Sequence, residues 1–266
     1  MNEQPTTFVT DDYFIGHPDI LYERTTYNFC HPVRERTTIV TAMPNHFKKH
    51  TFYICLVGAY MLLGGAYLLL GTKEGAILFF SERRSAVGDI FFRITTLLGE
   101  AYPYIIVALA ALAVRLRYTL LVAATGILVM LTSFSMKSFF QSDRPFTYFK
   151  KLGLLENINL VQGVELHTGA TSLPSGHAMS AFALYGLLAF LLATRKRTAA
   201  AFFAVALAVA LSRVYLVQHF WRDVYWGAIV GTLLAMLVYA FHLRFEHRPD
   251  SRIDRPLIKV GRSAGA

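Results

Sequence analysis

Long apolar runs constrain the fold of this 266-residue chain more than any other feature of its sequence. A helix needs about 20 apolar residues to cross a hydrocarbon layer about 30 Å thick, and there it must satisfy its own backbone polar groups. Five runs approach this length: 52–70, 118–136, 177–194, 198–216 and 224–241. Together with a mean hydropathy of +0.42, they make an integral membrane protein the first expectation.

Basic residues beside these runs predict the topology. Residues 101–114 form a sixth run that is short by itself and needs residues upstream, where Glu100 interrupts the apolar pattern. Short cytoplasmic loops carry an excess of Lys and Arg. The basic clusters are Lys48 with Lys49, Arg115 with Arg117, Arg195 to Arg197, and Arg244 with Arg248. Six spans put every cluster on one side, so we expect an all-α, six-transmembrane helical bundle with both termini cytoplasmic and its active-site loops extracytoplasmic.

The spans also divide the chain into segments. We expect residues 1–50 to be a cytoplasmic N-terminal segment, 51–243 the six-span domain, and 244–266 a basic cytoplasmic tail near anionic headgroups. Residues 1–12 lack the pattern of a cleavable signal, so the first run is expected to be retained as an anchor. Topology accounts for most of the formal charge of +9, which therefore does not indicate nucleic acid binding.

Cations gather where the third span ends, on the expected outer side. Lys137 ends this span, and Arg144 follows seven residues later, immediately before Pro145. If the helix continues, seven residues is near two turns, so both cations could point the same way, although Pro145 restricts the backbone of Arg144. Taken singly, a snorkelling end residue and an exposed loop residue are the ordinary explanations.

The segment Pro174-Ser175-Gly176-His177 combines a turn with a helix start at the same expected face. Ser is a favoured N-cap, Gly permits close approach, and a helix N-terminus offers free N–H groups to an anion. A phosphate would fit there. The ordinary alternative is an N-cap after a proline turn.

His219 and Asp223 form the third polar group, close to Ser212 and Arg213. On a helix, a carboxylate four residues away can accept a hydrogen bond from one imidazole nitrogen and leave the other free to attack. Arg213 and His219 are six residues apart, so a continuous helix would place them on different faces, and we expect a break between Tyr215 and His219. An interfacial ion pair within an aromatic belt is the alternative.

A metal centre is the main alternative to a phosphate site, because two His and an Asp can hold zinc or iron. Lys137, Arg144 and Arg213 argue against it. They would repel a divalent cation, whereas they complement the charge on a transferring phosphoryl group.

In their order and spacing, these motifs resemble the three signature motifs of the type 2 phosphatidic acid phosphatase superfamily, whose members include membrane lipid phosphatases and vanadium haloperoxidases. The resemblance covers about a third of the chain, from Lys137 to Asp223. It implies an integral membrane phosphatase acting on a lipid phosphate, with no metal and no cofactor, although vanadate can occupy the phosphate position in this family.

The resemblance also implies a role for each matching residue. His219 would be the nucleophile that becomes phosphohistidine, Asp223 would orient it, and His177 would be the general acid and then the base. The phosphate oxygens would be bound by Lys137, Arg144, Ser175, Gly176 and Arg213.

The substrate stays open. Phosphatidate, phosphatidylglycerophosphate, undecaprenyl pyrophosphate and a lipid A phosphate all suit a site at the outer leaflet, in a bacterial inner membrane with the site facing the periplasm or exterior. Residues 146–173 are expected to shape headgroup selection. Three alternatives remain: a phosphotransferase with the same site, a transporter or flippase, and a catalytically dead lipid-binding protein. Oligomeric state is not readable from the sequence.

Overall fold

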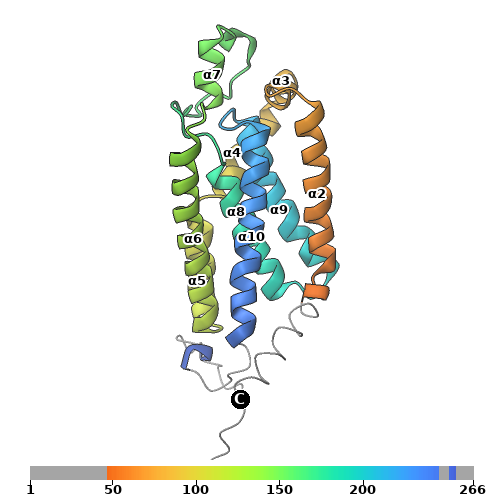
Figure 1. Ribbon diagram of the computed structural model, residues 1–266, viewed down its shortest axis with the longest axis vertical. Coiled ribbons are helices and arrows are strands. Elements are labelled where there is room, and N and C mark those ends of the chain that lie inside the picture. The colour runs from red at the N-terminus through yellow and green to blue at the C-terminus, as the bar shows by residue number, and fades with distance from the viewer. Residues whose placement is uncertain (1–46, 246–251, 256–266) are drawn as a thin grey trace, which may run out of the picture.

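The computed structural model describes residues 47–245 and 252–255, and this part of the chain is helical, without strands (Figure 1). The expected N-terminal segment and most of the expected tail therefore lie outside the described residues. The helices are α2 (Thr51–Leu70), α3 (Gly75–Glu82), α4 (Ala86–Leu97), α5 (Ala101–Leu112), α6 (Leu116–Phe140), α7 (Pro145–Lys151), α8 (Gly176–Leu192), α9 (Lys196–Tyr215) and α10 (Trp221–Phe245), with short 3-10 turns at Leu155–Asn157 and Arg252–Asp254.

Several of these helices are suited to crossing a membrane. Among the described residues, α2, α6, α9 and α10 are long and apolar enough, while α4 and α5 pass the same test only as a pair bent by 53°. The helix α8 is shorter, with 17 residues. The chain is thus multi-pass, with four such helices or five with the bent pair. The count of six spans and the orientation of the termini stay predictions.

The short helix α8 forms the centre of the bundle. Its residues 178–190 are buried without interruption, because α6, α9 and α10 pack around it. A helix that is apolar all round is stable when other helices surround it. The apolar composition of α8 thus suits its central position among other helices, and its crossing of the membrane stays a prediction.

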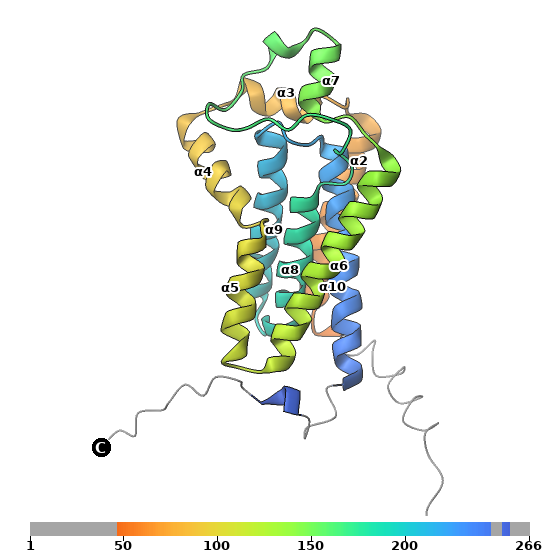
Figure 2. The same ribbon diagram turned by 90° about the vertical axis from the view of Figure 1, so that its left-hand side faces the viewer.

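The basic clusters lie at one end of the bundle. In Figures 1 and 2, the start of α2, the α5–α6 and α8–α9 junctions and the end of α10 are all at the lower end. The loops that follow α2, α6 and α9 are at the opposite end. Arg248 lies outside the described residues. The charge pattern thus marks one end of the bundle, as the sequence predicted.

Two glycines allow α8 and α10 to approach closely. A Cβ on Gly227 would lie 2.6 Å from the carbonyl oxygen of Ser175, and one on Gly231 would overlap that of Met179. Small residues four apart are a common means of bringing membrane helices together. Beside them, the backbone N–H of Ser175 donates to the carbonyl of Asp223 at 2.9 Å. This packing joins the start of α8 to the start of α10.

The break between α4 and α5 also packs against α8 (Figure 2). A Cβ on Gly99 would lie 2.6 Å from Cγ1 of Val209 and 3.2 Å from the carbonyl oxygen of His177. The hydroxyl of Tyr185 donates to the carbonyl of Leu98 at 3.0 Å. Glycine therefore permits the bent pair to touch both α9 and the first turn of α8.

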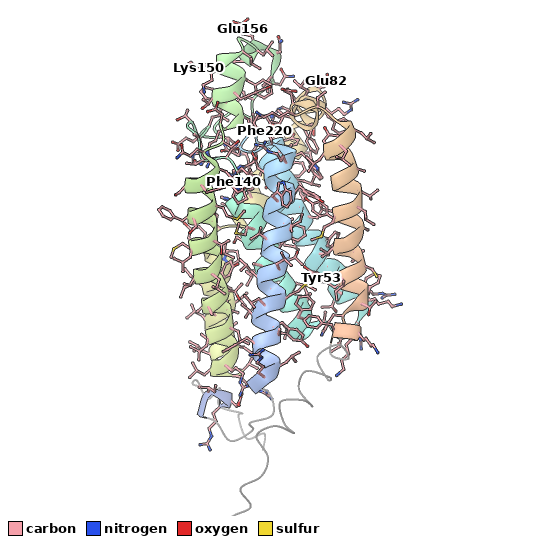
Figure 3. The ribbon with its side chains drawn as sticks, viewed as in Figure 1. Tyr53, Glu82, Phe140, Lys150, Glu156 and Phe220 are labelled. Carbon is pink, nitrogen blue, oxygen red and sulfur yellow. The ribbon has the colours of Figure 1, made fainter. Side chains whose placement is uncertain are left out.

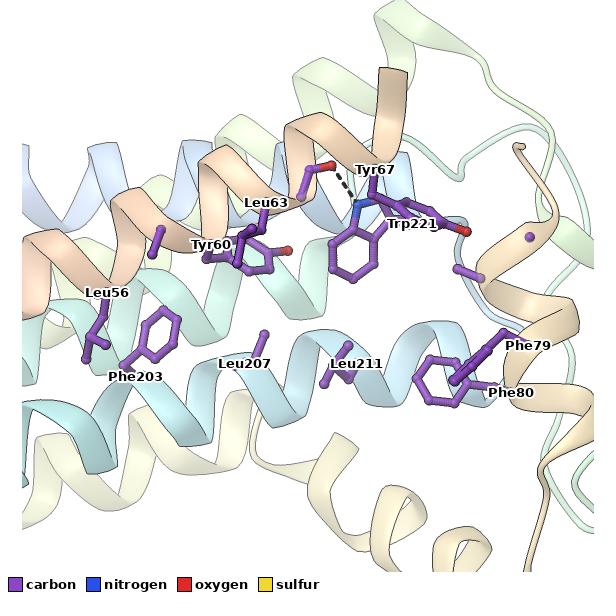
Figure 4. Close-up of a pocket in the computed structure, with 14 residues that line it drawn as sticks. Leu56, Tyr60, Leu63, Tyr67, Phe79, Phe80, Phe203, Leu207, Leu211 and Trp221 are labelled. Carbon is purple, nitrogen blue, oxygen red and sulfur yellow. Dashed lines mark hydrogen bonds between the residues drawn. The ribbon is translucent and has the colours of Figure 1, made fainter. Parts of the chain in front are cut away.

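An apolar groove runs between α2, α3 and α9 (Figure 4). It has a volume of about 650 Å³, and the indole N–H of Trp221 donates to the carbonyl of Gly64 at its wall. The groove is lined by apolar and aromatic residues such as Leu56, Phe203 and Leu211. The groove shares no lining residue with the polar cavity around His177 and Arg213 that is described below.

Candidate active site

The loop between α9 and α10 holds His219 in a fixed position. α9 ends at Tyr215 and α10 begins at Trp221, so the helix break predicted between Tyr215 and His219 is confirmed. Val217 adopts a left-handed conformation with φ 57°, and the backbone N–H groups of Gln218 and His219 both donate to the carbonyl of Arg213, at 2.9 and 3.1 Å. His219 is only 2% exposed. Figure 3 labels the next residue, Phe220, at the same end of α10.

A serine that the sequence motifs did not indicate lies beside His219. Nδ1 of His219 is 3.7 Å from Oδ2 of Asp223, which is a charge contact longer than a hydrogen bond. The hydroxyl of Ser172 donates to that Oδ2 at 2.5 Å and is 3.4 Å from Nδ1. The N–H of Phe220 donates to the same carboxylate oxygen at 3.1 Å. A proton on Nδ1 can therefore be held by Ser172 and Asp223, which leaves Nε2 with a free lone pair.

Burial keeps His219 neutral. Desolvation lowers the pKa of His219 to about 3, with Arg213 and Arg144 lowering it further and Asp223 opposing the shift. An imidazole with such a pKa is unprotonated at neutral pH. The loop therefore presents a neutral nucleophile.

The three predicted cations approach this region from three segments. α6 ends at Phe140, and Gln141 is left-handed with φ 40°, so the helix does not continue to Arg144 as the seven-residue spacing required. Arg144 is instead the extended N-cap residue of α7, with Pro145 at the first helical position. Lys137 and Arg144 thus reach the same site without sharing a helix face.

Neighbouring polar groups orient the two arginines. Arg144 donates from Nε to Thr171 at 3.2 Å and from Nη1 to the carbonyl of Gln218 at 3.4 Å. Arg213 donates from Nη1 to the hydroxyl of Thr96 on α4 at 2.6 Å. Both arginines are nearly buried, at 8% and 5% exposure. Their positions are therefore set by the bundle and not by solvent.

The first turn of α8 has the predicted cap. Ser175 is the N-cap residue, and its hydroxyl accepts from the N–H of Ala178 at 3.4 Å. A Cβ on Gly176 would lie 3.2 Å from Oγ of Ser133 and 3.6 Å from Nζ of Lys137. Glycine thus leaves room beside the ammonium group, at a helix terminus with unpaired N–H groups.

His177 has a carboxylate partner that the motif analysis missed. Its Nε2 is 2.6 Å from Oε1 of Glu100, the residue between α4 and α5. The sequence marked Glu100 only as an interruption of an apolar run. That interruption was the available signal, because an ionisable residue within a span needs a partner or a function.

These groups surround a cavity of about 240 Å³. Its lining includes Glu100, His177 and Arg213, and an adjoining hollow of about 330 Å³ reaches Arg144. Both are lined by His167, from the loop after α7. Burial, then Arg144 and Arg213, lower the pKa of His167, while Glu165 opposes the shift.

The structure thus brings all eight predicted residues to one end of the bundle. His177 and Arg213 line the cavity, Arg144 lines the adjoining hollow, and His219 and Asp223 are buried and line neither of the two. Lys137 is close enough to Arg144 and Arg213 to interact electrostatically. Within the described residues, no three His, Cys, Asp or Glu side chains are grouped as metal ligands would be.

Comparison with known proteins points to one family. The family model described as the PAP2 superfamily matches residues 116–246. Phosphatidylglycerophosphatase B of Bacillus subtilis (strain 168) is 36% identical over 84 residues, which are 29% of this chain and 41% of that protein. The chain therefore matches less than half the length of this curated relative.

Two crystal structures are similar. Aquifex aeolicus LpxE has a TM-score of 0.51 and 26% identity, over 61% of this chain and 91% of that one. The first transmembrane PAP2 type phosphatidylglycerolphosphate phosphatase from Bacillus subtilis has a TM-score of 0.53 and 21% identity, over 76% of this chain and 98% of that one. The second likeness concerns the fold alone.

Proposed function

Since the chain belongs to the PAP2 superfamily, we propose that it hydrolyses a phosphomonoester or pyrophosphate of a membrane lipid through a phosphohistidine at His219. One observation carries this proposal: a buried, neutral imidazole backed by Ser172 and Asp223 beside the guanidinium of Arg144. A nucleophile supported from behind and faced by cations suits attack on a phosphate.

The first step is transfer to the enzyme. Nε2 of His219 attacks phosphorus, the bond from phosphorus to the lipid oxygen breaks, and that oxygen takes a proton from His177. Arg144, Arg213 and Lys137 balance the charge on the phosphoryl oxygens. Ser175 and the N–H of Gly176 complete the phosphate site at the start of α8.

The second step releases phosphate. Water attacks the phosphohistidine and gives a proton to His177, which is neutral after the first step. The phosphorus–nitrogen bond then breaks, and its electron pair returns to His219. Both residues end in their starting states. The step needs no metal ion.

The proposed substrates are lipids with an exposed phosphate at the outer leaflet. Phosphatidylglycerophosphate gains support from the name of one relative, while phosphatidate, undecaprenyl pyrophosphate and a lipid A phosphate remain candidates. We place the site on the periplasmic or external face of a bacterial inner membrane, because the basic clusters lie at the other end of the bundle.

A lipid panel tests the proposal. The purified protein in detergent with chelator is expected to release phosphate from at least one of the four lipid classes. His219→Asn is expected to release none while keeping the unfolding midpoint of the wild type. Quenching in alkaline denaturant, where the phosphorus–nitrogen bond is stable, should trap phosphohistidine in the wild type only. Unchanged turnover in His219→Asn, or activity only with added metal, would contradict the mechanism.

Transfer to another lipid uses the same first step, so it needs its own measurement. Labelled substrate is supplied with candidate acceptor lipids, and the product is followed. Label appearing in a second lipid, with none in free phosphate, would replace hydrolysis by phosphotransfer.

A further inference from the structure

The geometry points to Glu100 as a positioning residue for His177, and this role rests on the proposed phosphatase function. We infer that its carboxylate binds Nε2 of His177, leaves Nδ1 for the lipid oxygen, and favours the protonated imidazole that the first step uses. The distance of 2.6 Å is short enough for a charge-assisted hydrogen bond.

An ordinary capping role does not account for this contact. Glu100 is the N-cap residue of α5, yet its side chain makes no capping hydrogen bond to that helix. It is directed to another helix, onto a side chain that lines the cavity. Glutamate is not among the preferred N-cap residues, so capping does not explain the identity of this residue either.

Gly99 allows the α4–α5 turn to bring Glu100 beside His177. The bent pair approaches α8 so closely that any Cβ at Gly99 would lie 3.2 Å from the His177 carbonyl oxygen. Tyr185 fixes the preceding residue, because its hydroxyl donates to the carbonyl of Leu98. The break in the apolar run therefore has a consequence for the site: it places a carboxylate beside His177 that a continuous α4–α5 helix would carry elsewhere.

The charges around His177 explain why a carboxylate is needed. Burial disfavours a positive imidazole most, and Arg213 of α9 and Lys137 of α6 add to this, while Glu100 favours the positive form. A general acid must carry its proton when the substrate arrives. Glu100 therefore offsets part of the effect of burial and of the cations that bind phosphate.

The imidazoles of His219 and His177 have opposite roles: His219 attacks phosphorus, and His177 donates a proton to the leaving oxygen. In the first step, the bond between phosphorus and the ester oxygen breaks, and its electron pair goes to that oxygen, which takes the proton of Nδ1. The Nε2 proton stays on the imidazole, hydrogen-bonded to Glu100, so His177 is left neutral. An alkyl ester needs this proton because its alkoxide is a strong base, whereas an aryl ester with an acidic phenol leaves without it.

Leaving-group dependence gives the test. The rate of phosphohistidine formation is measured by quenching in alkaline denaturant, with an alkyl lipid phosphate and with p-nitrophenyl phosphate. Glu100→Gln is expected to slow the alkyl ester by about 100-fold, the lower range for general acid catalysis, and the aryl ester by less than about 5-fold. Glu100→Asp should restore part of the rate. The control Glu82→Gln, at an exposed position of α3, should leave both rates unchanged.

A second comparison asks whether Glu100 acts through His177. Adding Glu100→Gln to His177→Asn should cause no further loss with the alkyl ester, because residues that act as a unit are not additive. Equal slowing of both esters by Glu100→Gln, or a further loss on the His177→Asn background, would overturn the role. If the wild type formed phosphohistidine with neither ester, the proposed function itself would be contradicted. Unfolding midpoints in detergent identify variants that fail to fold, and Glu100→Asp then carries the comparison.

Discussion

The hydroxyl of Ser172 lies 3.4 Å from Nδ1 of His219 and bridges it to a carboxylate that the imidazole does not reach directly. The spacing of four residues between His219 and Asp223 suggested a direct hydrogen bond. His219 instead precedes α10, so the pair does not share a helix, and the serine closes the gap.

Ser172→Ala is expected to slow phosphohistidine formation by roughly 5-fold with little change in KM. Loss of one hydrogen bond costs about 1 kcal/mol, and about 1.4 kcal/mol is tenfold in rate. Rapid quenching in alkaline denaturant measures the rate, and Ser138→Ala, at an exposed position of α6, is the matched control. A rate equal to that of the control would show that Asp223 orients His219 without the serine.

Arg144→Lys is expected to lower kcat/KM by about 10-fold to 100-fold, because hydrogen bonds to charged groups are worth about 1.5–3 kcal/mol and lysine cannot reproduce the planar fork. The guanidinium of Arg144 already donates hydrogen bonds to Thr171 and to the carbonyl of Gln218. Steady-state kinetics with the preferred lipid measure the effect. Arg83→Lys serves as the control, since its side chain is 59% exposed; equal values for the two variants would remove Arg144 from the phosphate site.

The free energy of unfolding should decrease as the pH is lowered, because of His219. Its pKa is about 3 in the folded protein and about 6.5 when unfolded, so between these values the unfolded chain binds the extra proton. The stability from this residue is fully present above about pH 6.5 and declines as pH falls toward 3, with a slope of up to about 1.4 kcal/mol per pH unit. Thermal unfolding in detergent from pH 4 to 7 measures it. His219→Asn should flatten the dependence, and a slope identical to that of the wild type would contradict this assignment.

Gly227→Ala is expected to destabilise the fold by about 1–3 kcal/mol, the usual cost of overpacking, because the added methyl meets the Ser175 carbonyl. Gly58→Ala is the matched control, since a Cβ there meets nothing within 4 Å. Unfolding midpoints of the two variants give the comparison. Equal midpoints would mean that α8 and α10 can separate without cost.

His167→Ala is expected to raise KM for lipid phosphates by roughly 10-fold, the effect of losing one hydrogen bond. The variant should cleave p-nitrophenyl phosphate at the same rate as the wild type. His167 lines both hollows and belongs to the loop predicted to select headgroups. Parallel KM measurements with lipid and aryl substrates check it. Equal changes with both would place His167 at the reacting phosphate and not at the headgroup.

The sequence predicted the large elements well because apolar length and basic clusters are local properties. It also predicted the helix break before His219, since six residues cannot keep Arg213 on the same face. It did not predict that α8 would be enclosed by protein, because an enclosed helix and a lipid-facing helix have the same composition.

The missed site residues have a common physical cause. Glu100, Thr96 and Ser172 meet their partners across long separations in the chain. No periodicity connects such pairs, because their contacts depend on the bend at Gly99 and on the course of the loop before α8. The condition under which Lys137 and Arg144 would share a helix face is not met, since the left-handed residue Gln141 follows the end of α6.

The enclosure of α8 has a consequence for the protein in different lipid environments. A bilayer that is thicker or thinner than a protein's apolar belt strains the helices that touch lipid, and they respond by tilting. Residues 178–190 are shielded from that strain by neighbouring helices. The outer helices can therefore adapt to acyl chains of different length while the spacing between the starts of α8 and α10 is conserved.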